Sequence, residues 1–148
     1  MRHLFTGLLL LLFCLPCSSK MRHLERKEDA KRNEYLIEKS KEVIMAFGSD
    51  YYGDYKEPLI TDIKTFKETF KDDPVLKNKK LFGRKYYTVT YQYDPSVETL
   101  LYNYAAAVDI WADDGQPKEV RFGNGRGQNF YAISYRRLRK IKVKEADY

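Results

Sequence analysis

Apolar side chains recur at helical spacing ahead of Gly48. If residues 28–47 are drawn as a helix, one side of it carries Leu36, Ile37, Ser40, Val43, Ile44 and Phe47. Gly48 follows this stripe, where helices commonly end. The pattern predicts a helix over about residues 28–47 whose second half packs on another element.

From Lys85 onward the period of the pattern changes to two, which is typical of strands. In "KYYTVTYQY", Tyr87 and Val89 fall on one face of the predicted strand, and Tyr86 and Thr88 fall on the other. The run "TLLYNYAAAVDIWAD", residues 99–113, alternates in the same way. Two further strand-like stretches, "KEVRFG" and "QNFYAISYRR", follow after short turns. These stretches predict a four-stranded antiparallel meander.

A glycine-rich turn lies between the last two of these stretches, in "RFGNGRGQNF". Gly123, Gly125 and Gly127 are evenly spaced, whereas a dinucleotide fingerprint needs G-x-G-x-x-G between a strand and a helix. Asn124 followed by Gly125 is typical of a type I′ hairpin. We therefore expect a hairpin whose exposed tip presents Asn124 and Arg126 to an anion or a partner carboxylate.

The segment before the meander has two interpretations. In "TDIKTFKETFKDDP", Thr61 is a suitable cap for a short helix with Ile63, Phe66 and Phe70 on one side. A strand that begins at Leu59 is the competing interpretation. Residues 35–144 are expected to form a single α+β domain, in which the first helix covers the apolar face of the meander.

A helix followed by a four-stranded meander resembles the cystatin-like and NTF2-like architectures of small exported envelope domains. The resemblance lies in element order over residues 35–137, and the QxVxG motif of cystatin inhibitors is absent. An NTF2-like cone would hold a small ligand between helix and sheet. This implies an alternative function, a pocket enzyme that uses a carboxylate with Tyr87, Tyr91 or Tyr104.

The N-terminus, "MRHLFTGLLLLLFCLPCSSK", reads as a signal peptide over residues 1–19. Cleavage after Ser19 would release a chain without cysteine. Alternatively, "CLPC" resembles a bacterial lipoprotein signal, in which Cys17 becomes the lipidated first residue. Both interpretations predict export to the periplasm, the cell surface or the medium. Residues 20–34 alternate charges of both signs and are expected to form a charged tether or the frayed start of a helix.

The charge balance favours anionic partners. The chain has 27 lysines and arginines against 21 acidic residues, a net charge of +6. Six of these cations lie in "RRLRKIKVK", residues 136–144, which indicates a continuation of the last strand or an edge strand protected by lysines. The alternative is a stripe that binds membrane headgroups or nucleic acid. Because export disfavours nucleic acid, the expected partner is a protein, a glycan or an anionic envelope component, and the only membrane contact expected is a lipid anchor at Cys17.

The residue types argue against catalysis. The two histidines, His3 and His23, lie in the signal and the tether, so no catalytic triad, zinc site or cofactor site is predicted. Trp111 falls on the polar face of its strand, near Arg121, and would form an exposed platform for a sugar, a peptide or a partner surface. A bulge at Ala105–Ala107 would instead return Trp111 to the core. The sequence thus predicts a non-catalytic binding domain that uses Trp111, Arg121, Asn124 and Arg126.

Overall fold

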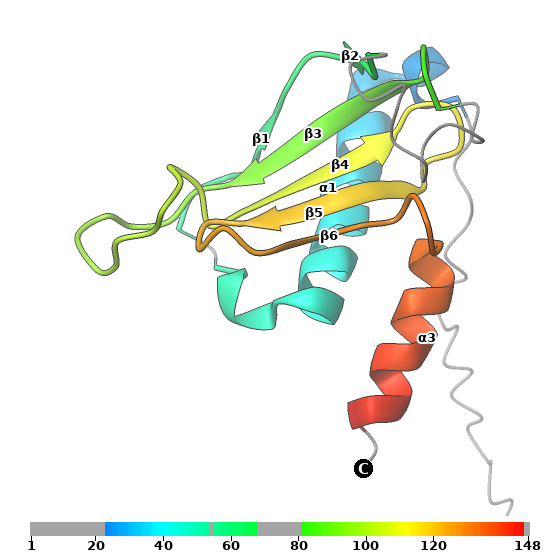
Figure 1. Cartoon of the computed structure of the whole chain (residues 1–148). Helices are drawn as coiled ribbons and strands as arrows, with labels where there is room; N and C mark the ends of the chain where they lie inside the picture. The colour runs from blue at the N-terminus through cyan, green and yellow to red at the C-terminus, as the bar shows by residue number, and fades with distance from the viewer. Residues whose placement is uncertain (1–22, 54, 68–80, 147–148) are drawn as a thin grey trace, which may run out of the picture.

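One long helix lies across one face of an antiparallel sheet, as Figure 1 shows. The structure is a computed structural model that describes residues 23–53, 55–67 and 81–146. Its helices are η1 (Leu24–Arg26), α1 (Asp29–Phe47), η2 (Ser49–Tyr51) and α3 (Tyr135–Ala146). Its strands are β1 (Leu59–Ile60), β2 (Lys64–Thr65), β3 (Lys85–Tyr91), β4 (Ala106–Trp111), β5 (Pro117–Phe122) and β6 (Gly127–Asn129). The strand order is β1-β3-β4-β5-β6, and β2 also pairs with β3. The predicted α+β class, with a helix packed on an antiparallel sheet, is confirmed.

The main core lies between α1 and the sheet. The predicted helix is confirmed, and Leu36, Val43 and Ile44 from its stripe are fully buried. They meet one face of the three long strands, whose side chains here are Tyr87, Val89, Tyr91, Ala106, Val108, Ile110, Val120 and Phe122. Burial of these apolar groups is the main force that holds α1 on the sheet.

A smaller cluster lies on the opposite face of the sheet. It consists of buried Phe66, Leu81 and Trp111, with Phe82, Tyr86 and Tyr131 packed against it, and we call it the aromatic cluster. Trp111 contributes to it because its neighbours Ile110 and Ala112 point to the α1 core. The predicted face of Trp111 is therefore right, although the side chain is covered.

The segment that begins at Leu59 forms strands. β1 pairs with the end of β3, and Lys64 in β2 lies opposite Tyr86. The predicted helix from Thr61 is therefore wrong for the described residues 61–67, because the pairing with β3 holds this stretch extended. Residues 68–73 of that predicted helix lie outside the described residues.

The long strand predicted for residues 99–113 is shorter in the structure. β4 begins at Ala106, and the preceding residues form a loop in which Leu101 is 73% exposed. The reason is that β3 ends at Tyr91, so residues before Ala105 have no strand to pair with on that side. The amide of Tyr102 instead donates to the carbonyl of Gly123, at 3.0 Å.

The glycine-rich turn joins β5 to β6, so the predicted hairpin is confirmed. Gly125 has a φ of +87° and its amide donates to the carbonyl of Phe122 at 3.0 Å, while Asn124 has a negative φ. The turn is therefore a three-residue loop with Gly125 in the left-handed region, and the predicted type I′ turn is wrong. Gly123 is required here, because a Cβ on it would lie 2.2 Å from the carbonyl oxygen of Tyr104.

The basic segment predicted to be an edge strand is helix α3. Pairing with β5 stops at Asn129, and the carbonyl of Ser134 accepts the amides of Arg137 and Leu138 at 3.0 and 3.1 Å. The helix places Tyr135 in the main core and Leu138 against it. A strand would put these two residues on opposite faces, which explains why the helix is favoured.

The described chain begins close to the sheet. Leu24 is fully buried, and its amide donates to the carbonyl of Ala112 at 2.7 Å. Residues 29–34, predicted both as part of a tether and as the start of a helix, form the first turns of α1. The predicted signal peptide and Cys17 lie outside the described residues.

Candidate ligand-binding site

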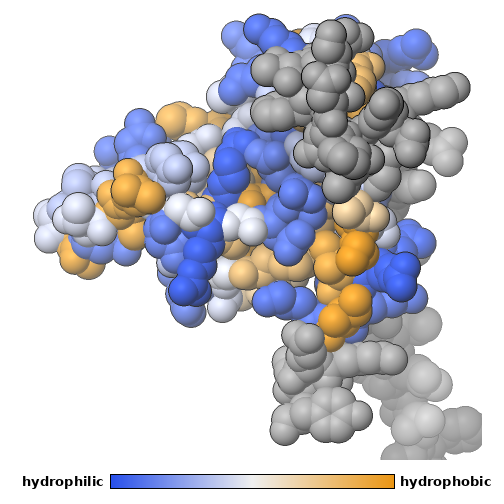
Figure 2. Space-filling model, viewed as in Figure 1, coloured by the Kyte–Doolittle hydropathy of each residue, from blue (hydrophilic) through white to orange (hydrophobic). Residues whose placement is uncertain are grey.

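The face of the sheet that α1 leaves open has a hollow of about 720 Å³. Figure 2 looks onto this face and shows hydrophilic residues across its middle. The hollow is lined from four segments of the chain, by Lys64, Thr65, Phe66, Lys67, Tyr86, Lys118, Glu119, Arg121 and Tyr131. We call it the open-face hollow.

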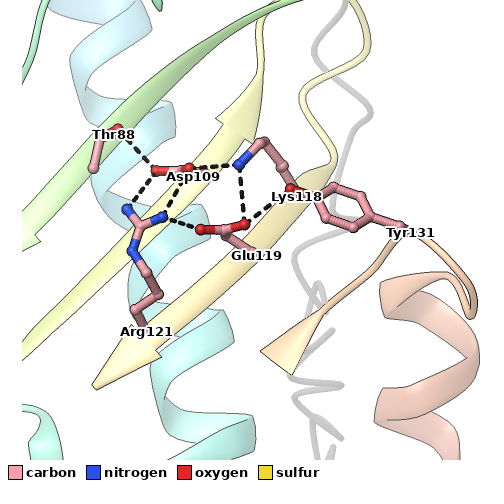
Figure 3. Close-up of polar contacts among 6 residues, drawn as sticks. All are labelled: Thr88, Asp109, Lys118, Glu119, Arg121 and Tyr131. Atoms are coloured by element: carbon pink, nitrogen blue, oxygen red, sulfur yellow. Dashed lines mark hydrogen bonds and ion pairs between the residues drawn. The ribbon is translucent and has the colours of Figure 1, made fainter. Parts of the chain in front are cut away.

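A closed ring of ion pairs forms at its floor, and in it cations and carboxylates alternate (Figure 3). Lys118 Nζ lies 2.8 Å from Asp109 Oδ2 and 3.0 Å from Glu119 Oε2. Arg121 Nη2 lies 3.1 Å from Asp109 Oδ1, and Arg121 Nη1 closes the ring by donating to Glu119. The charges of the ring sum to zero, so the floor is electrostatically compensated.

Asp109 is the buried centre of this ring, with 1% of its surface exposed. Its Oδ1 accepts from Thr88 Oγ1 at 2.8 Å and from Arg121, while its Oδ2 accepts from Lys118 and from Arg121. Each oxygen therefore already has two donors, which is the capacity of its lone pairs. This carboxylate is placed to fix its neighbours, and it has no lone pair left for proton transfer to a substrate.

Lys118 reaches the open face because of a β-bulge. Glu119 lies opposite Asp109, but Pro117 lies opposite Ile110, so Lys118 is the additional residue in β5. In an uninterrupted strand, Lys118 would share the α1 face with Val120. The bulge instead brings its Nζ to 4.6 Å from the ring centre of Tyr86 and 5.3 Å from that of Phe66.

Tyr131 closes one side of the hollow. Its ring lies 5.7 Å from that of Phe66, and its hydroxyl donates to Glu119 Oε2 at 2.9 Å. Burial raises the pKa of this hydroxyl, and the nearby Lys118 opposes the rise only in part. Tyr131 therefore stays protonated at neutral pH and acts as a hydrogen-bond donor there.

Two lysines at the edge of the hollow differ from the charged residues of the floor, which are all ion-paired. Lys64 and Lys67 are exposed and make no ion pair with a described residue. They add two positive charges beside a neutral ring and flat aromatic walls. The hollow thus combines two exposed cations with surfaces suited to a ring-shaped ligand.

Trp111, the predicted exposed platform, is only 5% exposed. Phe66 packs edge-on against it at 5.8 Å, and the Arg84 guanidinium lies 4.1 Å from its ring centre. Arg84 is held there by Asp113, which accepts from Arg84 Nε at 2.8 Å. Burial raises the pKa of Asp113, but the hydrogen bonds and the charge of Arg84, together with backbone hydrogen bonds, hold the pKa below its usual value. The prediction that Trp111 forms an exposed platform is therefore wrong. Its side chain instead packs beneath Phe66, a wall residue of the hollow.

The other predicted site residues do not meet at one place. Arg121 lies at the open-face hollow, but Asn124 and Arg126 lie on the β5–β6 hairpin, outside its lining. Both are exposed there, and Asn124 Oδ1 accepts the amide of Arg126 at 2.9 Å. Of the tyrosines in the enzyme hypothesis, Tyr87 and Tyr91 lie buried in the α1 core.

Sequence reasoning missed Lys118, Glu119 and Tyr131, which were assigned no role. Only the alternation of β4 and β5 gave a signal, because it put Asp109 and Arg121 on the same face. The bulge that adds Lys118 cannot be recognised in the sequence pattern.

Within residues 23–53, 55–67 and 81–146, no group of three or more His, Cys, Asp or Glu side chains is placed to hold a metal ion. No helix of this part of the chain is both long and apolar enough to cross a bilayer.

The chain was compared with models of protein families, with curated proteins and with solved structures. None of the three comparisons found a match.

Proposed function

We propose that this chain is an exported, non-catalytic binding domain of the cell envelope, of cystatin-like or NTF2-like architecture, and that its open-face hollow takes an anionic glycan component. One observation carries the proposal: a charge-compensated floor with aromatic walls lies beside two exposed cations, Lys64 and Lys67, that make no ion pair with a described residue. The half-buried rings of Tyr86 and Tyr131 would pack on a sugar ring. The lysines would attract its acidic group as point charges.

The floor supports binding more than chemistry. The Asp109 lone pairs are occupied, and Tyr131 is committed to Glu119 as a donor. Arg121 retains an exposed part of its guanidinium, because its side chain is 40% accessible. Glu119 and Arg121 thus offer an acceptor and a donor, held rigidly, for the hydroxyl groups of a sugar.

The binding site can be tested with defined sugars. Glucuronic acid and N-acetylmuramic acid would be titrated against the neutral probes glucose and N-acetylglucosamine, with NMR chemical shifts as the readout. We expect the acids to bind more tightly and to shift Tyr86 and Tyr131. Equal binding of acidic and neutral sugars, or shifts confined to another face, would contradict the proposal.

A matched pair of variants tests the lysines. Lys64→Gln with Lys67→Gln should weaken binding of the acids by roughly fivefold to tenfold, because each exposed cation contributes under about 1 kcal/mol. Lys41→Gln with Lys56→Gln removes the same charge from exposed positions outside the hollow. If both variants lose equal affinity, net charge rather than the hollow is responsible.

Export is tested separately by the mass of the chain recovered from the envelope. A chain that starts at Lys20 would support cleavage after Ser19, and a diacylglyceryl-modified chain that starts at Cys17 would support a lipid anchor. Recovery of the complete chain from the cytoplasm would refute export, without bearing on the binding site.

A further inference from the structure

The positive charge of this protein is concentrated in α3. The helix holds six of the 27 lysines and arginines and one of the 21 acidic residues, so the rest of the chain has 21 basic against 20 acidic residues. Away from α3 the chain is therefore nearly neutral. We therefore expect α3 to be the part of the protein that attracts an anionic partner.

One side of α3 is fixed to α1. The Tyr135 hydroxyl donates to Glu42 Oε1 at 2.9 Å, Arg139 also donates to Glu42, and Leu138 packs on the main core. Lys142 Nζ lies 5.8 Å from the ring centre of Phe47. These contacts order the helix and set which side of it faces outward.

The outward side carries Arg136, Arg137 and Lys140. All three side chains are exposed, and none makes an ion pair with a described residue. Their spacing of one and four positions puts them on one face of the helix. Figure 1 shows that the C-terminal half of α3 extends beyond the sheet.

An apolar side chain accompanies these cations. Ile141 lies one turn after Arg137 and is 43% exposed. A linear polyanion would use the cations alone, whereas a lipid surface also accepts an apolar group at the boundary of its acyl chains. The combination of Ile141 with its basic neighbours distinguishes the two kinds of partner.

We propose that α3 docks the protein on an anionic phospholipid surface, with Arg136, Arg137 and Lys140 at the headgroups and Ile141 at the acyl boundary. The inference does not depend on the open-face hollow. Near an anionic leaflet each basic residue strengthens binding roughly fivefold, so the three outward cations together account for roughly 100-fold.

Vesicle sedimentation tests this inference. The chain from Lys20 onward contains both hydrophobic clusters and excludes the apolar run at residues 8–15, which would itself bind lipid. We expect it to pellet with vesicles of phosphatidylcholine and phosphatidylglycerol, and not with phosphatidylcholine alone. High salt should release it. Equal binding to both kinds of vesicle, or to neither, would overturn the proposal.

Three variants locate the contact. Replacing Arg136, Arg137 and Lys140 by Gln should lower vesicle binding roughly 100-fold, and because Gln is a good helix former, circular dichroism should show an intact helix. Replacing Lys31, Lys41 and Lys56 by Gln removes the same charge from other exposed positions and should have a much smaller effect. An equal loss in both variants would overturn the assignment to α3.

Ile141→Ser tests the apolar contact. It should weaken vesicle binding and leave heparin binding unchanged. If Ile141→Ser leaves vesicle binding unchanged, a lipid contact is ruled out.

Discussion

The ion-pair ring beneath the open-face hollow predicts a large cost for Asp109→Ala. Asp109 is 1% exposed and Lys118 is 3% exposed, so the substitution leaves a buried ammonium without its main partner. Breaking a buried pair from one side costs about 3 to 5 kcal/mol. Lys118 and Arg121 both keep their contacts to Glu119, so we expect the lower end of this range, about 3 kcal/mol.

Guanidinium chloride unfolding, followed by circular dichroism and by Trp111 fluorescence, measures this cost. For a domain of this size the free energy of unfolding falls by about 3 kcal/mol per molar denaturant, so the midpoint should drop by about 1 M. Coincident transitions from the two probes would show that unfolding is two-state.

A double-mutant cycle separates the pair from its surroundings. Lys118→Met removes the cation and keeps much of its length, and the double variant should cost about 2 kcal/mol less than the two single losses added together. A loss below about 1 kcal/mol for Asp109→Ala, or simple additivity in the cycle, would place the ring among exposed ion pairs and refute the reasoning.

Three further results are expected. Trp111 emission should be blue-shifted and protected from iodide, because the side chain is 5% exposed, and red-shifted, quenchable emission would contradict its place in the aromatic cluster. Gly123→Ala should lower stability by about 1 to 3 kcal/mol in thermal unfolding, because its Cβ would meet the Tyr104 carbonyl, whereas Gly53→Ala, with open space around it, should be nearly neutral. Burial raises the pKa of Glu42, but hydrogen bonds from Lys39 and Tyr135, together with the charges of Lys39 and Arg139, hold the pKa below the ordinary value of 4.5. The stability that Glu42 contributes is therefore complete above pH 4.5 and is lost as the pH falls through the folded pKa, so Glu42→Gln should flatten the acid limb of a stability-against-pH curve.

The sequence predicted those elements in which the apolar residues recur with a single consistent period. The stripe of α1 and the alternation of Tyr87, Val89 and Tyr91 each match one kind of element. The basic segment is different, because Ile141 and Val143 alternate as in a strand while Leu138 and Ile141 are spaced as in a helix. Tertiary packing of Tyr135 and Leu138 on the main core decides between the two.

The candidate site was predicted only in part, because its geometry depends on contacts between distant segments. The pattern placed Trp111 and Arg121 on the open face correctly. It gave no indication that Phe66 and Leu81 would cover Trp111, since these come from stretches whose structure was ambiguous or unassigned. The Lys118 bulge likewise depends on the register between β4 and β5, which no single strand encodes.

Strand β4 belongs to both hydrophobic clusters, and every one of its residues is buried. Val108 and Ile110 pack under α1, whereas Trp111 packs in the aromatic cluster. Neither layer can open without exposing the strand that the other needs, so the two should unfold together as one cooperative unit. The amides of β4 should then exchange with solvent only through global unfolding, and a ligand on the open face should slow exchange in α1, on the far side of the sheet.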